Sequence, residues 1–157
     1  MSKLIYFLAF AFCSILVLSS CETDDDPIPE QFETTYAIEE VENSGVFGNI
    51  TFKKSGEDAT IIIIELEGTV AGVNHPANLF NTSPEKEQPA FLALNPVDGA
   101  SGRSETVVTI LDDGSRTTYE DWVGFDGYVT IQESMENPDA NIAIGFLGEN
   151  IPNIPGG

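Results

Sequence analysis

The chain has few residues that could carry out nucleophilic or transition-metal chemistry. It contains one histidine, His75, and two cysteines, Cys13 and Cys21. A Ser-His-Asp or Cys-His site needs a histidine beside its nucleophile, and no G-x-S-x-G turn is present. Zinc and copper sites need several nitrogen or sulfur ligands, which these residues cannot supply within one chain. We therefore expect no enzymatic activity and no cofactor.

Aspartates in turn-like segments are the remaining candidates for metal binding. Calcium prefers six to eight oxygen ligands, and carboxylates are plentiful in this chain. The candidates are Asp112 and Asp113 in LDDGS, Asp126 in FDG and Asp139 in NPDAN. None follows the D-x-D-x-D-G pattern of a calcium loop, and aspartate is also a common turn residue. A carboxylate-based calcium-binding or other metal-dependent module is therefore the alternative to a purely binding role.

Short segments in which apolar and polar residues alternate predict an all-β domain. Residues 59–68 include the run Ile61–Ile64, which predicts a central strand buried on both faces. Gly- and Asp-rich turns separate the segments, so we expect an antiparallel two-sheet sandwich of about seven or eight strands. The predicted strands cover residues 34–41, 46–54, 59–68, 90–95, 104–111, 127–134 and 140–148.

Two stretches interrupt this β pattern. Residues 68–89 contain three prolines and little periodicity, which predicts a long loop with His75 in it. Thr117 and Glu120 have the spacing of a capping box, which predicts one helical turn before Gly124. Trp122 would anchor that turn against the sandwich.

The N-terminal residues resemble a bacterial lipoprotein signal. Lys3 precedes an apolar run, as in a secretory signal peptide, and this run is too short to favour a retained transmembrane helix. The sequence Leu18-Ser19-Ser20-Cys21 resembles the lipobox, in which cleavage precedes a diacylated cysteine. The resemblance implies a signal peptide over residues 1–20 and a lipidated Cys21. Two or more acyl chains would hold the protein stably on a membrane.

The remaining chain divides into three parts by composition. Residues 21–33 are acidic and proline-punctuated, which predicts a flexible tether. Residues 34–150 form the predicted β domain, and residues 151–157 form a tail expected to fray. Acidic residues just after the cysteine also resemble the export signal of Bacteroidetes-type surface lipoproteins. We therefore expect the protein on the outer membrane, lipid-anchored and facing outward.

The charge balance restricts the class of partner. Six Lys and Arg residues face 26 Asp and Glu residues, for a formal net charge of −20. Nucleic-acid binding requires basic patches that displace counterions, so nucleic acid is excluded as a partner. A self-repelling surface also favours a monomer. The expected partners are the membrane, through the anchor, and an unidentified envelope protein or glycan.

Residues 44–150 resemble the CHRD domain family, whose sandwich is similar to copper–zinc superoxide dismutase. The segments LNPVDGASGRS and FDGYVTIQ are the most specific parts of the resemblance. It implies a Greek-key sandwich. Family members typically have H-P-A-H-I-H-F-N-T after the third strand and a further histidine in a later strand.

This chain departs from the family pattern at the metal-ligand positions. His75-Pro76-Ala77 matches the start of the motif and Phe80-Asn81-Thr82 its end, but only Asn78 and Leu79 lie between them. The H-x-H pair is therefore absent, and Gln132 stands at the position of the later histidine. The resemblance thus implies a non-enzymatic binding or scaffolding domain that has lost its metal site. We expect His75 to be a turn residue beside Pro76.

Overall fold

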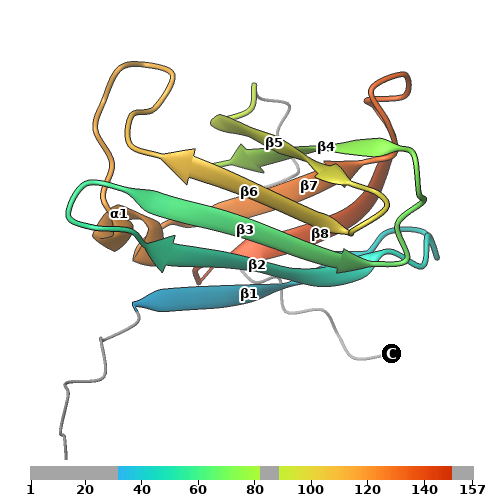
Figure 1. The fold of residues 1–157 in the computed structure, drawn as a ribbon, viewed down its shortest axis with the longest axis horizontal. Helices are drawn as coiled ribbons and strands as arrows, with labels where there is room; N and C mark the ends of the chain where they lie inside the picture. Colours follow the sequence, from blue (N-terminus) through green and yellow to red (C-terminus); the bar gives the residue numbers. More distant parts are fainter. Residues whose placement is uncertain (1–31, 82–88, 150–157) are drawn as a thin grey trace, which may run out of the picture. The chain divides into compact units, whose positions relative to one another are not determined.

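The computed structural model describes residues 32–81 and 89–149. These residues form eight antiparallel strands and one short helix (Figure 1), so the predicted all-β antiparallel fold is confirmed. The predicted signal peptide, Cys21, most of the tether and the tail lie outside the described residues. The elements are β1 (Glu33–Glu40), β2 (Phe47–Lys54), β3 (Thr60–Glu67), β4 (Asn74–Phe80), β5 (Leu92–Asp98), β6 (Arg103–Val108), α1 (Tyr119–Val123), β7 (Gly127–Gln132) and β8 (Asn141–Leu147).

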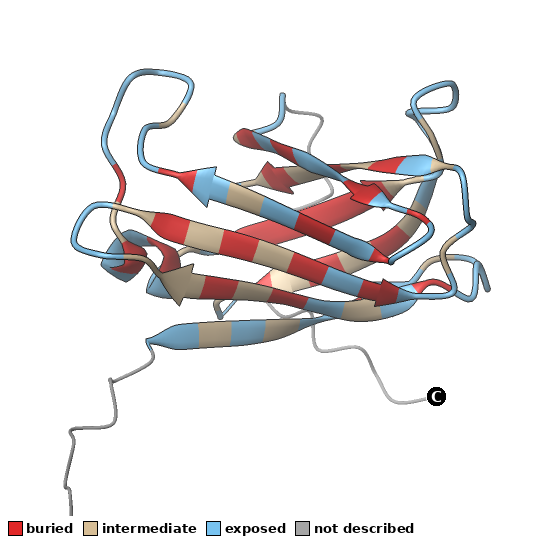
Figure 2. Cartoon of the chain, in the orientation of Figure 1, coloured by how far each residue is buried: buried red, intermediate tan, exposed pale blue. Residues whose placement is uncertain are grey.

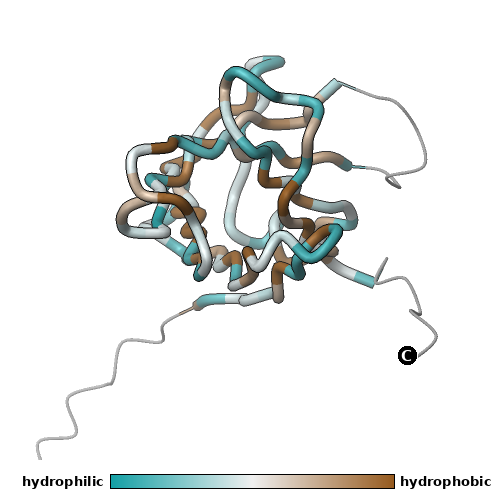
Figure 3. Tube along the Cα trace, turned by 90° about the vertical axis from the view of Figure 1, so that its right-hand side faces the viewer, coloured by the Kyte–Doolittle hydropathy of each residue, from teal (hydrophilic) through white to brown (hydrophobic). Residues whose placement is uncertain are grey.

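The strands close into one barrel. Their order around it is β1-β2-β3-β6-β5-β4-β7-β8, and β8 pairs with β1. The view along the barrel shows the strands as a ring (Figure 3). Two hydrogen-bonded neighbours are not consecutive in the chain: β3 lies beside β6, and β4 lies beside β7. The prediction of a sandwich of two sheets is therefore not confirmed, because the ladder is continuous.

The ladder has few paired residues at two places. Between β1 and β8 the paired residues are Glu39 with Ile144 and Glu40 with Ala143. Between β5 and β6 the pairing is at the hairpin, where Asp98 faces Arg103. The barrel is thus two well-paired halves joined along two weaker seams.

Side chains of polar residues strengthen the β5–β6 seam. The Asn95 N–H donates to Oγ1 of Thr106 at 2.9 Å, and the Asn95 side-chain amide donates to the Glu105 carbonyl at 2.8 Å. The Ser104 hydroxyl donates to the Asn95 carbonyl at 2.6 Å. These bonds satisfy main-chain groups that the backbone ladder leaves unpaired.

The isoleucine run forms β3, but only one of its faces is fully buried. Ile62 and Ile64 point into the core, whereas Ile61 and Ile63 are partly exposed on the outer surface. Buried residues alternate with intermediate or exposed ones along β3 in Figure 2. The strand is central, between β2 and β6, as predicted. The prediction that both faces are buried is wrong, because no second layer covers the outside of the barrel wall here.

The stretch predicted as one long loop contains a strand. Residues Asn74–Phe80 form β4, which pairs with β5 and β7. His75, Ala77 and Leu79 are buried at alternate positions. The register shifts between His75 and Ala77, at Pro76, which has no N–H to donate to a ladder. The prediction of His75 as a turn residue is therefore wrong.

Helix α1 covers one end of the barrel. The Thr118 N–H donates to the Asp121 carboxylate at 2.8 Å, so the capping box lies one residue later than the predicted pair of Thr117 and Glu120. Trp122 is 2% exposed and stacks on Phe52 of β2, with ring centroids 5.5 Å apart. The prediction that Trp122 anchors this turn in the core is confirmed.

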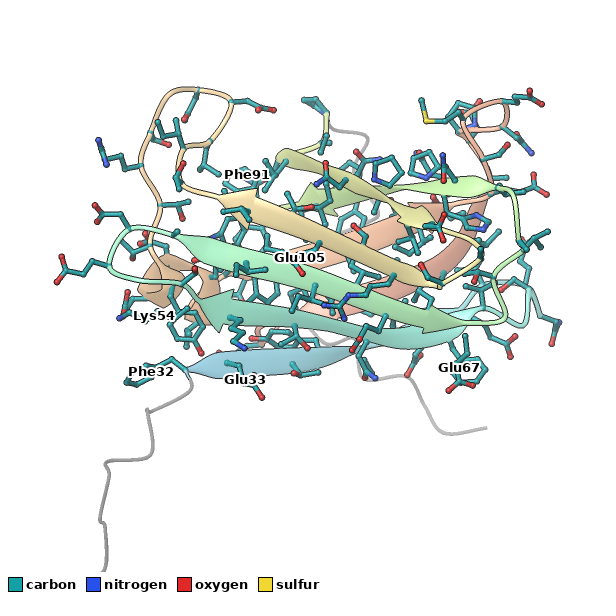
Figure 4. All side chains as sticks on the ribbon, in the orientation of Figure 1. Phe32, Glu33, Lys54, Glu67, Phe91 and Glu105 are labelled. Atoms are coloured by element: carbon teal, nitrogen blue, oxygen red, sulfur yellow. The ribbon has the colours of Figure 1, made fainter. Side chains whose placement is uncertain are left out.

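The fold begins before the predicted boundary at residue 34. The Lys54 N–H donates to the Phe32 carbonyl at 2.9 Å. The Phe32 ring lies 6.3 Å from that of Tyr119 on α1, and the Thr34 hydroxyl is 2.9 Å from the Tyr119 hydroxyl. Figure 4 shows Phe32 beside Lys54, whose Nζ is 5.2 Å from the ring centroid. The chain therefore enters the barrel at the end that α1 covers.

Candidate functional site

His75 points into the barrel and is held by main-chain oxygens. It is 3% exposed, and its Nδ1 lies 2.7 Å from the Glu133 carbonyl oxygen and 3.2 Å from that of Gln132. A ring nitrogen that faces two acceptors must donate, so the proton is on Nδ1. Nε2 is buried without a hydrogen-bond partner among the described residues. His75 thus joins the start of β4 to the end of β7.

Asn78 and Gln132, the other two residues compared with the family pattern, lie on the outside of the same wall. Asn78 pairs with Thr130 across the β4–β7 ladder, and Gln132 is two residues further along β7. The alternation of side chains along a strand puts both on the face opposite to His75. The structure therefore brings Asn78 and Gln132 to one face and separates them from the imidazole.

Aromatic packing fills the outer face near Asn78. The rings of Phe80 and Tyr128 stack with centroids 4.7 Å apart. Burial raises the pKa of the Tyr128 phenol. Within residues 32–81 and 89–149, no group of three or more His, Cys, Asp or Glu side chains is arranged to hold a metal ion.

The four calcium candidates are divided between the two ends of the barrel. Asp126 precedes β7 and Asp139 follows it, and a strand of that length spans about 20 Å. Asp112 and Asp113 lie in the excursion between β6 and α1, at the end where Asp126 lies (Figure 1). The structure therefore does not bring the four carboxylates to one place.

Two of these aspartates have a local structural role. Oδ1 of Asp113 accepts the Ser115 hydroxyl at 2.5 Å and the Ser115 N–H at 2.8 Å, and these bonds lower the pKa of the Asp113 carboxyl. Oδ1 of Asp126 accepts the Glu149 N–H at 2.7 Å. The two Asp113 bonds stabilise a turn, which is the alternative that the sequence left open for this residue. The Asp126 bond instead joins the start of β7 to the end of β8.

A depression lies beside α1. It consists of two adjoining cavities of about 330 Å³ and 150 Å³ that share Phe91 and Leu111. We call it the barrel-end hollow. Phe91, Leu111 and Phe125 provide apolar surface, whereas Asp112 and Arg116 add polar groups of both signs.

Local structure pre-forms this hollow. Phe91, Trp122 and Phe125 contact one another, with centroid distances of 5.3 Å, 5.4 Å and 6.3 Å. On the opposite side, the excursion that carries Leu111 folds as a small hairpin. Its Leu111 N–H donates to the Ser115 carbonyl at 2.8 Å, and Gly114 turns the chain at a φ of 83°. A ligand would therefore meet a wall that is already ordered, which reduces the entropic cost of binding.

Sequence reasoning missed the barrel-end hollow. It placed Phe91 and Leu111 in strands and treated Phe125 as part of a turn. One signal was present: Trp122 and Phe125 are three residues apart in a helical turn, a spacing that puts two aromatic rings on one face. The LDDGS segment did predict a turn within residues 110–116, but no sequence signal showed that this turn would lie beside Phe91 and Phe125.

No protein-family model matches the chain, and neither a curated protein nor a solved structure is significantly similar to it. Among the residues that the structure describes, no helix has the length and hydropathy needed to cross a bilayer.

Proposed function

We propose that this chain is a non-enzymatic, lipid-anchored envelope protein whose barrel binds a glycan in the barrel-end hollow. The observation that carries the proposal is the composition of the hollow. Aromatic rings suit the C–H faces of sugar rings, and neighbouring carboxylate and guanidinium groups suit their hydroxyls. The cavity of about 330 Å³ is at the lower end of the usual size for small-molecule sites.

Charge selects the class of glycan. The net charge of −20 repels polyanions, so neutral sugars or amino sugars are the expected ligands. Asp112 and Asp113 at the rim favour a ligand with hydroxyl or ammonium donors. Sulfated and uronic-acid polymers would bind weakly.

Loss of the family's metal site is the second part of the proposal. The CHRD-like, Greek-key assignment is supported by the strand order, in which β4, β5 and β6 are consecutive while β3 flanks β6 and β7 flanks β4. In this barrel the His75 Nδ1 donates to main-chain carbonyls. Asn78 and Gln132 stand where the family pattern has metal-binding histidines. We infer that the scaffold was retained for binding after the redox chemistry was lost.

Anchoring and location follow from the N-terminal sequence. The lipobox-like Leu18–Cys21 segment supports acylation of Cys21, and the acidic residues after it support display on the outer surface of the outer membrane.

Fluorescence of the single tryptophan tests the glycan proposal. Trp122 lines the smaller cavity, so a sugar in the hollow should change its emission. The titration uses the mature chain with Cys21→Ser and three probes: cello-oligosaccharides, chitosan oligomers and the anionic polymer heparin. We expect a saturable change in Trp122 emission with the cello-oligosaccharides or with the chitosan oligomers, and no change with heparin.

Variants at the rim link the signal to the site. Asp112→Ala and Arg116→Ala should weaken binding, whereas Glu105→Ala, on the outer face of β6, should not. Absence of binding to either neutral or amino sugars, or equal effects of all three substitutions, would contradict the proposal.

Thermal melting with Ca²⁺ or Cu²⁺ separates this function from the metal-dependent alternative. An ion that binds only the native state must raise the melting temperature. We expect the same melting temperature with Ca²⁺, with Cu²⁺ and with a chelator. A rise that Asp112→Ala or Asp126→Asn abolishes would favour the calcium module instead.

A further inference from the structure

The outer face of β4, β7 and β8 carries a row of aromatic side chains. β7 lies between the other two strands (Figure 1). Phe80 of β4 pairs with Tyr128 of β7, and Tyr128 pairs with Phe146 of β8, so the three side chains share one face. Val129 and Ile131 of β7 point into the core, so Tyr128 and its two partners point outward. We call these three residues the aromatic row.

The aromatic row belongs to a larger apolar surface. The Phe80 and Tyr128 rings stack with centroids 4.7 Å apart. Ile144 stands two residues before Phe146 on β8 and therefore lies on the same outer face. Ile144 and Phe146 also line a groove of about 240 Å³ on the side of β8 that faces β1. An apolar surface on the outside of a barrel indicates a packing partner.

The chain leaves β8 close to this surface. Gly148 and Glu149 form a turn after β8, and Gly148 has a φ of 74°, which favours glycine. The Glu149 N–H donates to Oδ1 of Asp126 at 2.7 Å. Asp126 is two residues before Tyr128, which is a separation of about 7 Å along an extended chain. The residues that follow Glu149 therefore start close to the aromatic row.

The sequence of residues 150–157 suits an apolar surface. These residues, NIPNIPGG, have no charged side chain. Ile151 and Ile154 each precede a proline, which favours the polyproline II conformation. This helix has three residues per turn, so the two isoleucines lie on one side of it, about 9 Å apart. That distance is close to the separation of about 10 Å between β4 and β8, the strands on either side of β7.

We propose that residues 151–155 dock on the outer face of β7 and β8, with Ile151 and Ile154 against the aromatic row and the adjoining groove. Docking removes apolar surface of both the segment and the barrel wall from water, which favours the bound state. No strand is added, because Pro152 and Pro155 have no N–H and β7 is already paired on both sides. The proposal replaces the expectation that this tail frays, and it does not depend on glycan binding in the barrel-end hollow.

Charge argues against a second copy of this chain as the occupant. Each copy has a net charge of −20. Glu39 lines the groove, and Asp126 and Glu149 lie near the aromatic row, so another acidic surface would be repelled there. The predicted tether, residues 21–33, is acidic as well. Residues 150–157 meet no such repulsion.

Nuclear magnetic resonance of the mature chain with Cys21→Ser tests the proposal. We expect nuclear Overhauser effects between the methyl groups of the two isoleucines and the rings of the aromatic row. Backbone order parameters at Ile151, Asn153 and Ile154 should approach about 0.85, the value of a rigid backbone, whereas a flexible segment gives less than about 0.6.

Substitutions in the segment test the role of the isoleucines. The double variant Ile151→Ser, Ile154→Ser should lose the Overhauser effects, and its order parameters should fall below about 0.6. The double variant Asn150→Ser, Asn153→Ser changes the same number of residues in the same segment without removing apolar surface. It is the matched control and should keep the contacts.

A substitution on the barrel wall locates the site. Ile144→Ser removes apolar surface from the groove and should lower the order parameters of residues 151–154. Ile63→Ser, at a residue that is likewise half-buried on the outer face of β3, is the control and should leave them unchanged. If Ile144→Ser unfolds the barrel, the variants of the segment still decide, because they leave the wall intact.

Any of three results would overturn the proposal. The first is order parameters below about 0.6 for residues 151–154 in the chain without these substitutions. The second is Overhauser effects from the two isoleucines to another face of the barrel, or from residues 21–31 to the aromatic row. The third is a dimer in sedimentation whose formation shifts the ring signals of the aromatic row, because the occupant would then be a second copy.

Discussion

The Nδ1 of His75 on β4 lies 2.7 Å from the main-chain carbonyl oxygen of Glu133, just beyond β7. The same nitrogen is 3.2 Å from the Gln132 carbonyl. This shared donor fixes the start of β4 to the point where β7 leaves the barrel. The only imidazole in the chain therefore satisfies main-chain acceptors in the wall of the barrel.

Replacing His75 with Leu should destabilise the fold. The change leaves the two carbonyl oxygens without their donor, and a buried acceptor without a partner costs about 1–3 kcal/mol. Urea unfolding followed by circular dichroism measures the effect. Met135→Leu, at a residue exposed in the nearby turn, is the control. An unchanged midpoint for His75→Leu would show that the bonds contribute nothing.

Truncating Trp122 should have a larger effect. The indole is buried between Phe52 and the rings of Phe91 and Phe125, and Trp→Ala in a core costs about 3–5 kcal/mol. Denaturant titrations of Trp122→Ala and of Val123→Ala measure the difference. Val123 is exposed on the same helix, so its truncation should change stability by about 0.5 kcal/mol or less. Similar losses for both variants would mean that the helix, rather than the indole, is responsible.

Gly48 should not tolerate a side chain. A Cβ at this position on β2 would lie 2.0 Å from the Glu65 carbonyl oxygen on β3. The ladder between the two strands would have to shift, and overpacking of this kind costs about 1–3 kcal/mol. Thermal melting of Gly48→Ala should show a clear decrease in midpoint. Gly124→Ala is the control, because its nearest neighbouring atom would be 4.0 Å away; equal melting of the two variants would contradict the prediction.

Asp98 should contribute to the acid dependence of stability. The Ser101 N–H, the Ser101 hydroxyl and the Ala100 N–H all donate to its carboxylate and lower its pKa. Because the unfolded chain has the higher pKa, the contribution is complete above the ordinary aspartate pKa of about 3.9. It is lost as the pH falls through the lower pKa of the folded state.

Melting curves across the acid range check this dependence. Asp98→Asn should be less stable than the parent chain near neutral pH, and the difference should vanish in strong acid. Ser101→Ala should reduce the difference as well, since it removes one of the donors. A difference in stability between Asp98→Asn and the parent chain that stays constant with pH would exclude a role for the Asp98 charge.

Cys21→Ser should release the protein from membranes. Two acyl chains anchor a protein stably on a membrane, and the proposed lipidation of Cys21 would supply them. Fractionation of expressing cells, followed by immunoblotting, compares this variant with Cys13→Ser, which lies in the predicted signal peptide. We expect only Cys21→Ser to move to the soluble fraction. Retention of both variants in the membrane would argue against lipidation at Cys21.

The strands with a regular apolar pattern in the sequence could be predicted, whereas β4 and the closure of the barrel could not. β2 follows the simple apolar–polar pattern, and β8 is a short apolar run. β4 was missed because Pro76 and two asparagines interrupt the pattern, although its buried positions still alternate. Closure of the barrel depends on the pairing of Glu39 with Ile144, which are far apart in sequence and have no local signature.

The candidate site was predictable only in fragments. The sequence correctly indicated that Trp122 is an anchor. The barrel-end hollow combines Phe91, Leu111 and Phe125, which come from three separate segments that only the strand order brings together. No spacing rule within one segment can detect such a combination.

The attachment of Phe32 to Tyr119 has a consequence for how far the barrel-end hollow can lie from the proposed lipid anchor. Tyr119 and Trp122 share α1, so the chain enters the barrel at the end that bears the hollow. With Cys21 acylated as proposed, the twelve residues from Cys21 to Phe32 reach about 40 Å at most when fully stretched. The end of the barrel that bears the hollow would then be tethered within that distance of the lipid leaflet. Sugars close to the bilayer, such as the head groups of glycolipids, would be within reach.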